Sequence, residues 1–149
     1  MRGFKVCKGY ENFDINLPKR STKYSAGYDI ESAEDVVINP KEVKVIKTGI
    51  KAYMGNDEVL KIYPRSSLGI KKQLMMANTV GIIDSDYFEN PNNDGHIQVA
   101  LYNYGDKVQE IKKQERIAQG IFVKFLISED EEEVVNVRQG GIGSTNNLY

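Results

Sequence analysis

The segment from Gly81 to Tyr87 holds the residue types in this chain that are best suited to chemistry. Directly after an apolar run that ends at Gly81, it places the carboxylates of Asp84 and Asp86 and the ring of Tyr87 within four residues. A carboxylate at the end of a β arm can accept a proton from water, and an adjacent tyrosine can wall off a sugar or a base. We therefore predict a site-like turn here and not a core strand.

A second group of residues suits phosphate. Arg65 is followed by Ser66 and Ser67, which begin the one segment with a helical pattern, residues 66–73, and lysines near its end complement the helix dipole. A guanidinium, hydroxyls and the free amides of a helix start together make a good phosphate seat. The same residues also fit an ordinary N-cap by either serine and a surface ion pair by Arg65.

The chain ends in a Gly- and Asn-rich stretch, residues 138–149, which we expect to form a flexible tail. Its glycines, interleaved with Arg138, Ser144 and Thr145, offer amides and hydroxyls that can wrap a phosphate. A simple disordered terminus has the same composition. The acidic run at 129–133 repels itself and is predicted to be a solvated loop.

Most of the remaining chain reads as short strands separated by Gly, Pro, Asn and Asp. Runs rich in β-branched and aromatic residues, mostly alternating with period two, occur at 43–48, 59–63, 97–102 and 121–125. Many short strands at close spacing predict an all-β sandwich or barrel. At 149 residues the chain is expected to form a single domain, 1–149, with 138–149 as its tail.

Charge and composition exclude several classes of function. With 20 basic and 21 acidic side chains, the net charge of −1 gives no global field to attract a nucleic acid. No run approaches the ~20 apolar residues that span a bilayer, so we expect a soluble, intracellular protein without a membrane partner. The single cysteine and single histidine allow no disulfide and no usual zinc site. We expect Cys7 to be an apolar filler and His96 a surface residue.

Five motifs stand in one order along the chain. They are Ala26-Gly27-Tyr28-Asp29-Ile30, Pro64-Arg65-Ser66-Ser67-Leu68, Asn78 through Tyr87, Arg116-Ile117-Ala118-Gln119 and Gly140-Gly141-Ile142-Gly143-Ser144-Thr145. In this the sequence resembles the trimeric all-β dUTPase family from about Ala26 to Thr145. The resemblance implies a jelly-roll-like β barrel and a homotrimer whose active sites draw on all three subunits. It also implies cleavage of dUTP to dUMP and pyrophosphate with Mg²⁺, in the cytoplasm of a cell or of a virus's host.

The resemblance assigns roles to individual residues. Asp84 matches the base that activates water for attack on the α phosphorus, and Tyr87 the residue that packs on the deoxyribose and excludes a 2′-hydroxyl. Residues 78–83 match the hairpin whose backbone reads uracil. The other implied roles are substrate binding by Asn78, Gly81, Ile83, Arg65, Ser66, Ser67, Gln119, Arg138, Ile142, Gly143, Ser144 and Thr145, and a structural or water-mediated metal role for Asp29. Mg²⁺ itself is expected to be held mainly by substrate phosphates and water.

The chain departs from the family pattern in its tail and in the loop after Tyr87. Ile142 stands where the family usually has a phenylalanine that stacks on uracil, and Arg138 is one residue closer to the glycines than usual. The loop at 88–96 is longer than the common pattern, which fits either a contact with a neighbour or a plain surface insertion. Two alternatives follow: a dCTP deaminase of the same fold, or a non-catalytic regulatory protein switched by nucleotide.

Overall fold

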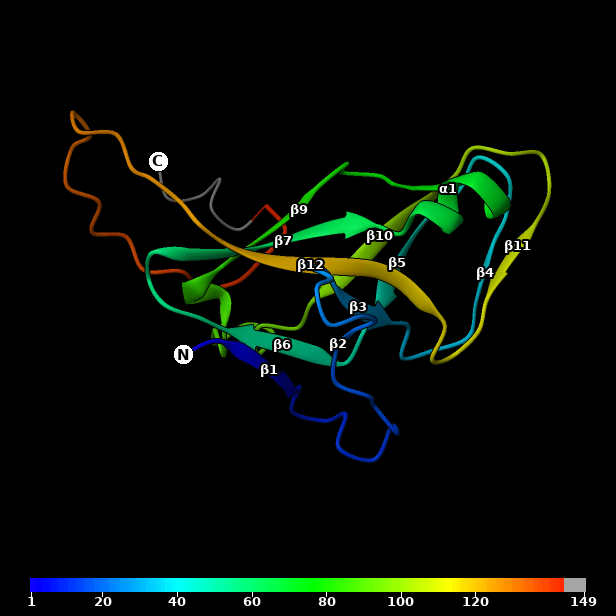
Figure 1. Cartoon of the computed structure of the whole chain (residues 1–149), viewed down its shortest axis with the longest axis horizontal. Helices are drawn as coiled ribbons and strands as arrows, with labels where there is room; N and C mark the ends of the chain where they lie inside the picture. Colours follow the sequence, from blue (N-terminus) through cyan, green and yellow to red (C-terminus); the bar gives the residue numbers. More distant parts are fainter. Residues whose placement is uncertain (144–149) are drawn as a thin grey trace.

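The computed structural model describes residues 1–143, which form short strands and one α-helix (Figure 1). The first seven strands are β1 (Gly3–Val6), β2 (Lys19–Arg20), β3 (Tyr28–Glu31), β4 (Val36–Ile38), β5 (Val43–Lys47), β6 (Ile50–Tyr53) and β7 (Glu58–Pro64). After them come α1 (Ser66–Lys72), β8 (Leu74–Met76), β9 (Gly81–Asp84), the 3₁₀ turn η1 (Ser85–Tyr87), β10 (Gln98–Asn103), β11 (Gln109–Ile111) and β12 (Arg116–Lys124). The expected all-β architecture with one short helix is confirmed.

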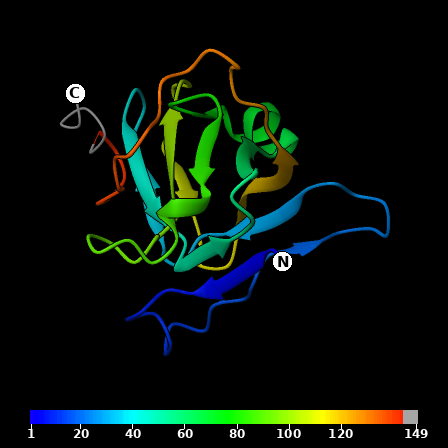
Figure 2. The ribbon, with the colours of Figure 1, turned by 90° about the vertical axis from the view of Figure 1, so that its left-hand side faces the viewer.

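The strands form four antiparallel groups. A five-stranded sheet has the order β2-β3-β12-β7-β9, a three-stranded sheet the order β5-β10-β8, and β1-β6 and β11-β4 are two-stranded pairs. Two views at right angles place β1 and α1 on opposite sides of the molecule (Figures 1 and 2). The long central pair is β12 with β7, in register from Ala118↔Pro64 to Lys124↔Glu58. The two groups of site residues described below lie near opposite ends of this pair.

The four predicted strands are all present, and their alternation has the expected cause. On β10, Val99 and Leu101 face the core and are at most 1% exposed, whereas their neighbours Gln98, Ala100 and Tyr102 are half-buried. The strand predicted at 121–125 is longer than expected and already begins at Arg116. The core consists of Ile30, Ile38, Ile46, Ile50, Ala52, Leu60, Ile62, Leu68, Leu74, Met76, Ile97, Val99, Leu101, Ile111, Ile117 and Ala118.

The segment predicted as a turn is in its first half a strand, so that prediction was wrong. β9 pairs with β7 from Gly81↔Ile62 to Asp84↔Val59 and forms the edge of the large sheet. Gly81 fits there because a Cβ atom would stand only 3.1 Å from Cβ of Ile62. The hairpin expected over 78–83 is also different: β8 belongs to the three-stranded sheet and β9 to the five-stranded one, so the turn between them crosses from sheet to sheet.

The helix is found where it was predicted, but neither serine caps it. Arg65, in an extended conformation, is the N-cap residue, and no side chain bonds to the first turn. Lys71 and Lys72 lie in the last turn, as expected. Lys72 Nζ donates to a Glu115 carboxylate oxygen at 2.7 Å and to the Glu110 carbonyl at 2.8 Å, which ties the helix to β11 and to the loop that follows it.

Cys7 is buried, as predicted, whereas the surface position predicted for His96 is wrong. His96 is 8% exposed, because the long loop after Tyr87 turns back and delivers it to the core. Its Nε2 accepts the amide of Gly49 at 2.9 Å, and its ring lies 4.9 Å from that of Tyr10. Within residues 1–143, no helix has the length and apolarity needed to cross a bilayer.

Candidate active site

A pocket of about 320 Å³ lies beside β9, and most residues of the third motif surround it. Its walls come from β9, the turn before it, the outer face of the three-stranded sheet and the start of the tail. The predicted site residues that line it are Asn78, Gly81, Ile83, Asp84, Tyr87, Arg138, Ile142 and Gly143. Residues distant in sequence thus share one cavity, which we call the Asp84 pocket.

Asp84 stands at the mouth of this pocket, at the carboxyl end of β9. Its side chain is 47% exposed and accepts a hydrogen bond from Arg138 Nη2 at 2.7 Å. Arg138 also donates from Nε to Asp86 at 2.7 Å and from Nη1 to the Gly140 carbonyl at 3.2 Å. One guanidinium therefore joins the two acids of the motif to the tail, which is a charge-assisted arrangement.

Tyr87 is the last residue of η1, and its ring is fixed at the hydroxyl end. The hydroxyl donates to the His96 carbonyl at 2.6 Å and accepts from Asn93 Nδ2 at 2.8 Å. Burial raises the pKa of the Tyr87 phenol, so the ring stays neutral near pH 7. A rigid, uncharged ring at the pocket wall suits packing against an apolar face of a ligand.

The described part of the tail, residues 138–143, lies over this pocket. A Cβ atom at Gly141 would come within 2.8 Å of the Tyr87 ring, so the backbone approaches the ring closely only because residue 141 is glycine. Ile142 lines the pocket, yet it is 89% exposed. Ser144 and Thr145 lie outside the described residues.

The remaining site residues form a second cluster around the N-cap of α1. Arg65 Nε lies 3.3 Å from Asp29 Oδ1, and Arg116 Nη1 lies 3.7 Å from Asp29 Oδ2. Ser21 Oγ donates to Asp29 at 2.5 Å. The side chain of Asp29 is only 15% exposed, so this carboxylate lies on the inner side of the two guanidinium groups and orients them. Its position fits the structural role expected for it.

Gln119 belongs to the same cluster, because it pairs with Asp29 on one side and with Tyr63 on the other. Its Nε2 donates to the Pro64 carbonyl at 3.2 Å. Gly27 leaves the space that the Gln119 amide occupies, since a Cβ atom there would collide with Oε1 of Gln119. Gly27 of the first motif therefore makes room for the side chain of Gln119 in the fourth motif.

The surface next to this cluster is basic. A cavity of about 460 Å³ is lined by Arg65, Lys71, Lys72 and Arg116, together with Ser67 and Glu115. Four cations against one carboxylate match a polyanion better than a neutral ligand. We call Arg65, Ser66, Gln119 and the cations around them the basic cluster. Arg116 was not among the predicted site residues, although its place in the fourth motif and its charge could have indicated it.

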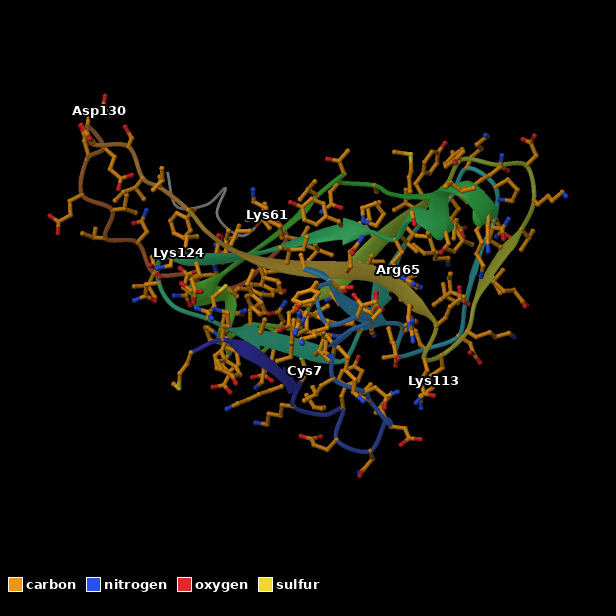
Figure 3. All side chains as sticks on the ribbon, in the orientation of Figure 1. Cys7, Lys61, Arg65, Lys113, Lys124 and Asp130 are labelled. Atoms are coloured by element: carbon orange, nitrogen blue, oxygen red, sulfur yellow. The ribbon has the colours of Figure 1, made fainter. Side chains whose placement is uncertain are left out.

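Within one chain the Asp84 pocket and the basic cluster lie far apart. Asp84 pairs with Val59 near the start of β7, whereas Arg65 directly follows the last residue of that strand. The position of Asp84 and that of Arg65 are therefore six residues of extended strand apart, which at about 3.3 Å per residue is about 20 Å. Figure 3 shows the same separation, with Lys124 at one end of β12 and Arg65 near the other.

No group of three or more His, Cys, Asp or Glu side chains within residues 1–143 is arranged to hold a metal ion. Burial raises the pKa of the Cys7 thiol to about 12, so it is protonated at neutral pH and is neither a nucleophile nor a ligand. The basic cluster contains two carboxylates: both oxygens of Asp29 already face other side chains, and Glu115 is paired with Lys72. A metal ion here would need most of its ligands from a bound substrate and water.

Three comparisons place the chain among known proteins. The family model for dUTPase matches residues 14–146. The deoxyuridine 5′-triphosphate nucleotidohydrolase of Lactococcus lactis is 51% identical over 146 residues, which cover 97% of each chain. The crystal structure of a dUTPase from Streptococcus mutans superposes with a TM-score of 0.81 at 42% identity, covering 85% of this chain and 98% of the other.

A more distant structure agrees in fold. The dUTPase of Staphylococcus aureus phage phi11, in a mutant described as coordinating a structural Mg(II) ion, superposes with a TM-score of 0.73 at 21% identity. It covers 89% of this chain and 96% of the phage protein. At this identity the likeness concerns the arrangement of strands alone.

Proposed function

Because the chain belongs to the dUTPase family, we propose that it hydrolyses dUTP to dUMP and pyrophosphate with Asp84 as the base. The observation that carries this proposal is the Asp84 pocket, where a half-exposed carboxylate stands beside a cavity lined by Tyr87, by Asn78 and by the first three residues of β9. A deaminase of the same fold has less support, because the relatives are named as nucleotidohydrolases.

Asp84 is placed to orient water and to take its proton. A general base must reach the proton directly or through one water, and the exposure of Asp84 leaves room for that water. In the free chain the carboxylate is paired with Arg138. We propose that Arg138 exchanges this partner for a phosphate oxygen when substrate binds, because a guanidinium fork suits both anions. The exchange would free Asp84 for the water and draw the tail over the phosphates.

The pocket can select uracil and deoxyribose by shape and hydrogen bonding. Asn78 and the residues of β9 line the cavity, and we propose that their backbone groups reject a base whose polar atoms would stay unpaired. Tyr87 stands as a rigid wall, and a 2′-hydroxyl on the sugar would collide with it. Ile142 can cover the base without the stacking that an aromatic ring supplies.

The basic cluster is proposed to hold the triphosphate. Arg65, Ser66 and Gln119 supply a guanidinium, a hydroxyl and an amide, and Arg116 and the helix lysines add charge around them. Mg²⁺ bound to the phosphates would neutralise charge that develops at the reacting phosphorus. Glu115 is already paired with Lys72, so we propose that the chain's own share in holding the ion is limited to Asp29, acting through water.

One chain cannot complete this site by itself. A phosphate bound at Arg65 would lie about 20 Å from Asp84 of the same chain, far beyond the reach of one water. We therefore propose that Asp84 of one subunit acts on a triphosphate held by the basic cluster of another. This division agrees with the shared sites that the family resemblance implied.

The outer face of the three-stranded sheet offers an interface for such an assembly. Val43, Val45 and Met75 are 50%, 46% and 41% exposed on this face. Tyr102 pairs with Val43 on one side and with Met75 on the other, and Val45 pairs with Ala100, so the apolar side chains are contiguous. Contiguous exposed apolar surface is typical of association sites. Val45 and Ala100 also line the Asp84 pocket, so a subunit seated here would reach the site. We propose a homotrimer.

The test is pyrophosphate release from dUTP with Mg²⁺. Asp84→Asn keeps the size of the side chain and removes the base, so turnover should fall by at least about 100-fold while dUTP still binds. Turnover by Asp84→Asn at the wild-type rate would remove Asp84 from the base role. Wild-type protein that binds dUTP without releasing pyrophosphate would instead support the regulatory alternative.

A further inference from the structure

The loop at residues 88–96 is longer than its family pattern, and in the site as described so far it only holds the hydroxyl of Tyr87. It directly follows Tyr87 and ends at His96, whose carbonyl accepts the Tyr87 hydroxyl. Glu89 and Asp94 have positive φ angles of 52° and 62°. Residues other than glycine rarely adopt such a conformation, so contacts from elsewhere must hold the loop in this shape.

Lys51 supplies the strongest of these contacts. It lies on β6 and is 7% exposed, and its ammonium group lies 2.9 Å and 3.0 Å from the two oxygens of Asp94 and 2.9 Å from Glu89. The ammonium also lies 5.2 Å from the centre of the Phe88 ring. Burial alone would lower the pKa of Lys51, but the hydrogen bonds to Asp94 and Glu89 raise it above its ordinary value. The lysine is therefore charged and joined to both ends of the loop.

The loop in turn holds the ring of Tyr87 through a network of amides. Asn93 Nδ2 donates to the Tyr87 hydroxyl at 2.8 Å, and Asn90 Nδ2 donates to Asn93 Oδ1 at 2.7 Å. Asn90 Nδ2 also donates to the backbone carbonyl of Tyr87 at 2.8 Å. Asn90 is only 6% exposed. Tyr87 is thus held both at its hydroxyl and at its backbone carbonyl by the same loop.

The loop also meets the tail. A Cβ atom at Gly140 would stand 2.6 Å from Nδ2 of Asn92, and one at Gly141 would stand 2.8 Å from the ring of Tyr87. The two glycines therefore lie flat on a surface formed by the loop and the ring. A change in the loop would move both the sugar wall and the seat of the tail.

We propose that the 88–96 loop determines sugar specificity in this enzyme, and that Lys51 is its positioning residue. Lys51 does not touch the pocket; it acts through Asp94, Glu89 and the asparagine network to fix the ring of Tyr87. The inference rests on the proposed role of Tyr87 as the wall that excludes a 2′-hydroxyl. The ring of Tyr87 can exclude a 2′-hydroxyl only if it does not move aside. The discrimination between dUTP and UTP therefore depends on how rigidly the ring is held as well as on its presence.

Two variants loosen the loop to different degrees. Lys51→Met keeps the length of the side chain and removes the charge, which leaves Asp94 and Glu89 without their buried partner. Asp94→Asn is milder, because asparagine tolerates the left-handed conformation and can still accept the Lys8 amide that Asp94 accepts at 2.8 Å. Ile111→Val, in the core on β11 and away from the loop, is the control for a general loss of stability.

The measurement is the ratio of kcat/KM for dUTP to kcat/KM for UTP, with Mg²⁺, on the assembled enzyme. We expect Asp94→Asn and Lys51→Met to lower this ratio by at least about fivefold, mainly through faster UTP turnover and a higher KM for dUTP. The control should keep the wild-type ratio even where its unfolding temperature falls. If Lys51→Met does not fold, Asp94→Asn alone decides.

The outcomes separate this inference from the function on which it rests. A wild-type ratio in Asp94→Asn, with dUTP turnover intact, would overturn the loop proposal and leave the dUTPase activity standing. A lowered ratio in Ile111→Val as well would also overturn it, because the effect would then follow stability. A wild-type protein that cleaves neither nucleotide would instead refute the proposed function.

Discussion

Two inactive variants should restore each other's activity when they assemble together. Asp84→Asn removes the base and leaves the basic cluster intact, whereas Arg65→Gln does the reverse. The six residue steps from Val59, the partner of Asp84 on β7, to Arg65, which directly follows that strand, place these side chains about 20 Å apart in one chain. A competent site therefore combines Arg65 of an Asp84→Asn subunit with Asp84 of an Arg65→Gln subunit.

The expected recovery follows from counting sites. In a closed trimer in which each site takes Arg65 from one subunit and Asp84 from its neighbour, a mixed trimer has one intact site in about three. Random assembly at equal amounts makes about three quarters of the trimers mixed, so an unfractionated mixture should recover about a quarter of wild-type turnover, and mixed trimers purified through both tags about a third. The two chains would be coexpressed with different tags, purified through both and assayed for pyrophosphate release.

A matched pair serves as the control for this experiment. Arg65→Gln and Gln119→Ala both damage the basic cluster, so their mixed trimers contain no intact site and should stay inactive. Sedimentation of each mixture establishes that hetero-oligomers have formed. Hetero-oligomers of Asp84→Asn with Arg65→Gln that show no turnover would refute the divided site, as would recovery by the control pair.

Two further predictions concern the tail and the buried histidine. Ile142→Phe should lower KM for dUTP by up to about tenfold, because it adds an aromatic stacking contact worth ~0.5–1.5 kcal/mol, and steady-state kinetics that equal those of wild type would contradict this. Burial, followed by the charge of Lys47, lowers the pKa of His96, so the unfolded chain binds its proton first as pH falls. Stability should thus be complete above about pH 6.5 and decline below it, at up to 1.4 kcal/mol per pH unit. His96→Gln, whose amide oxygen can still accept the Gly49 amide, should flatten the fall of unfolding temperature between pH 7 and 5, and an unchanged slope would exclude this origin.

The strands could be predicted from the sequence because their signals are local. In β10 the inward residues Val99 and Leu101 alternate with less buried ones, and the β-branched and aromatic residues of β5, β7 and β12 mark strands in the same way. The lysines at the end of α1 are equally local. β9 was predicted as a turn because the carboxylate of Asp84 and the ring of Tyr87 just after it are typical of a site-like turn, whereas its pairing partner is β7, some twenty residues earlier.

The interior of the site depends on contacts that no local pattern contains. Nothing in the sequence around Lys51 indicates its role, because its partner Asp94 lies more than forty residues later and contacts it only in the folded chain. His96 sits in a run of turn residues, which favours the surface, but the loop that carries it is drawn inward by the same ion pairs. Neither serine caps the helix, because Arg65 occupies the N-cap position and its guanidinium faces Asp29. The order of the motifs indicated the chemistry of the site, whereas contacts between residues far apart in sequence determine where the site residues lie.

Because the two clusters are separated, a single subunit is not expected to hydrolyse a nucleotide by itself. A base and a phosphate seat at opposite ends of one strand cannot act on a nucleotide until a second subunit supplies the missing half. In the single chain Asp84 is already paired with Arg138, and Arg65 with Asp29, so a central residue of each half is held in an internal ion pair. Assembly and substrate must then replace both ion pairs with contacts to one triphosphate, and only a ligand with several phosphates offers enough negative charge to do so. On this reasoning a uracil deoxynucleoside monophosphate, which has the same base and sugar, should leave the Arg138–Asp84 pair in place.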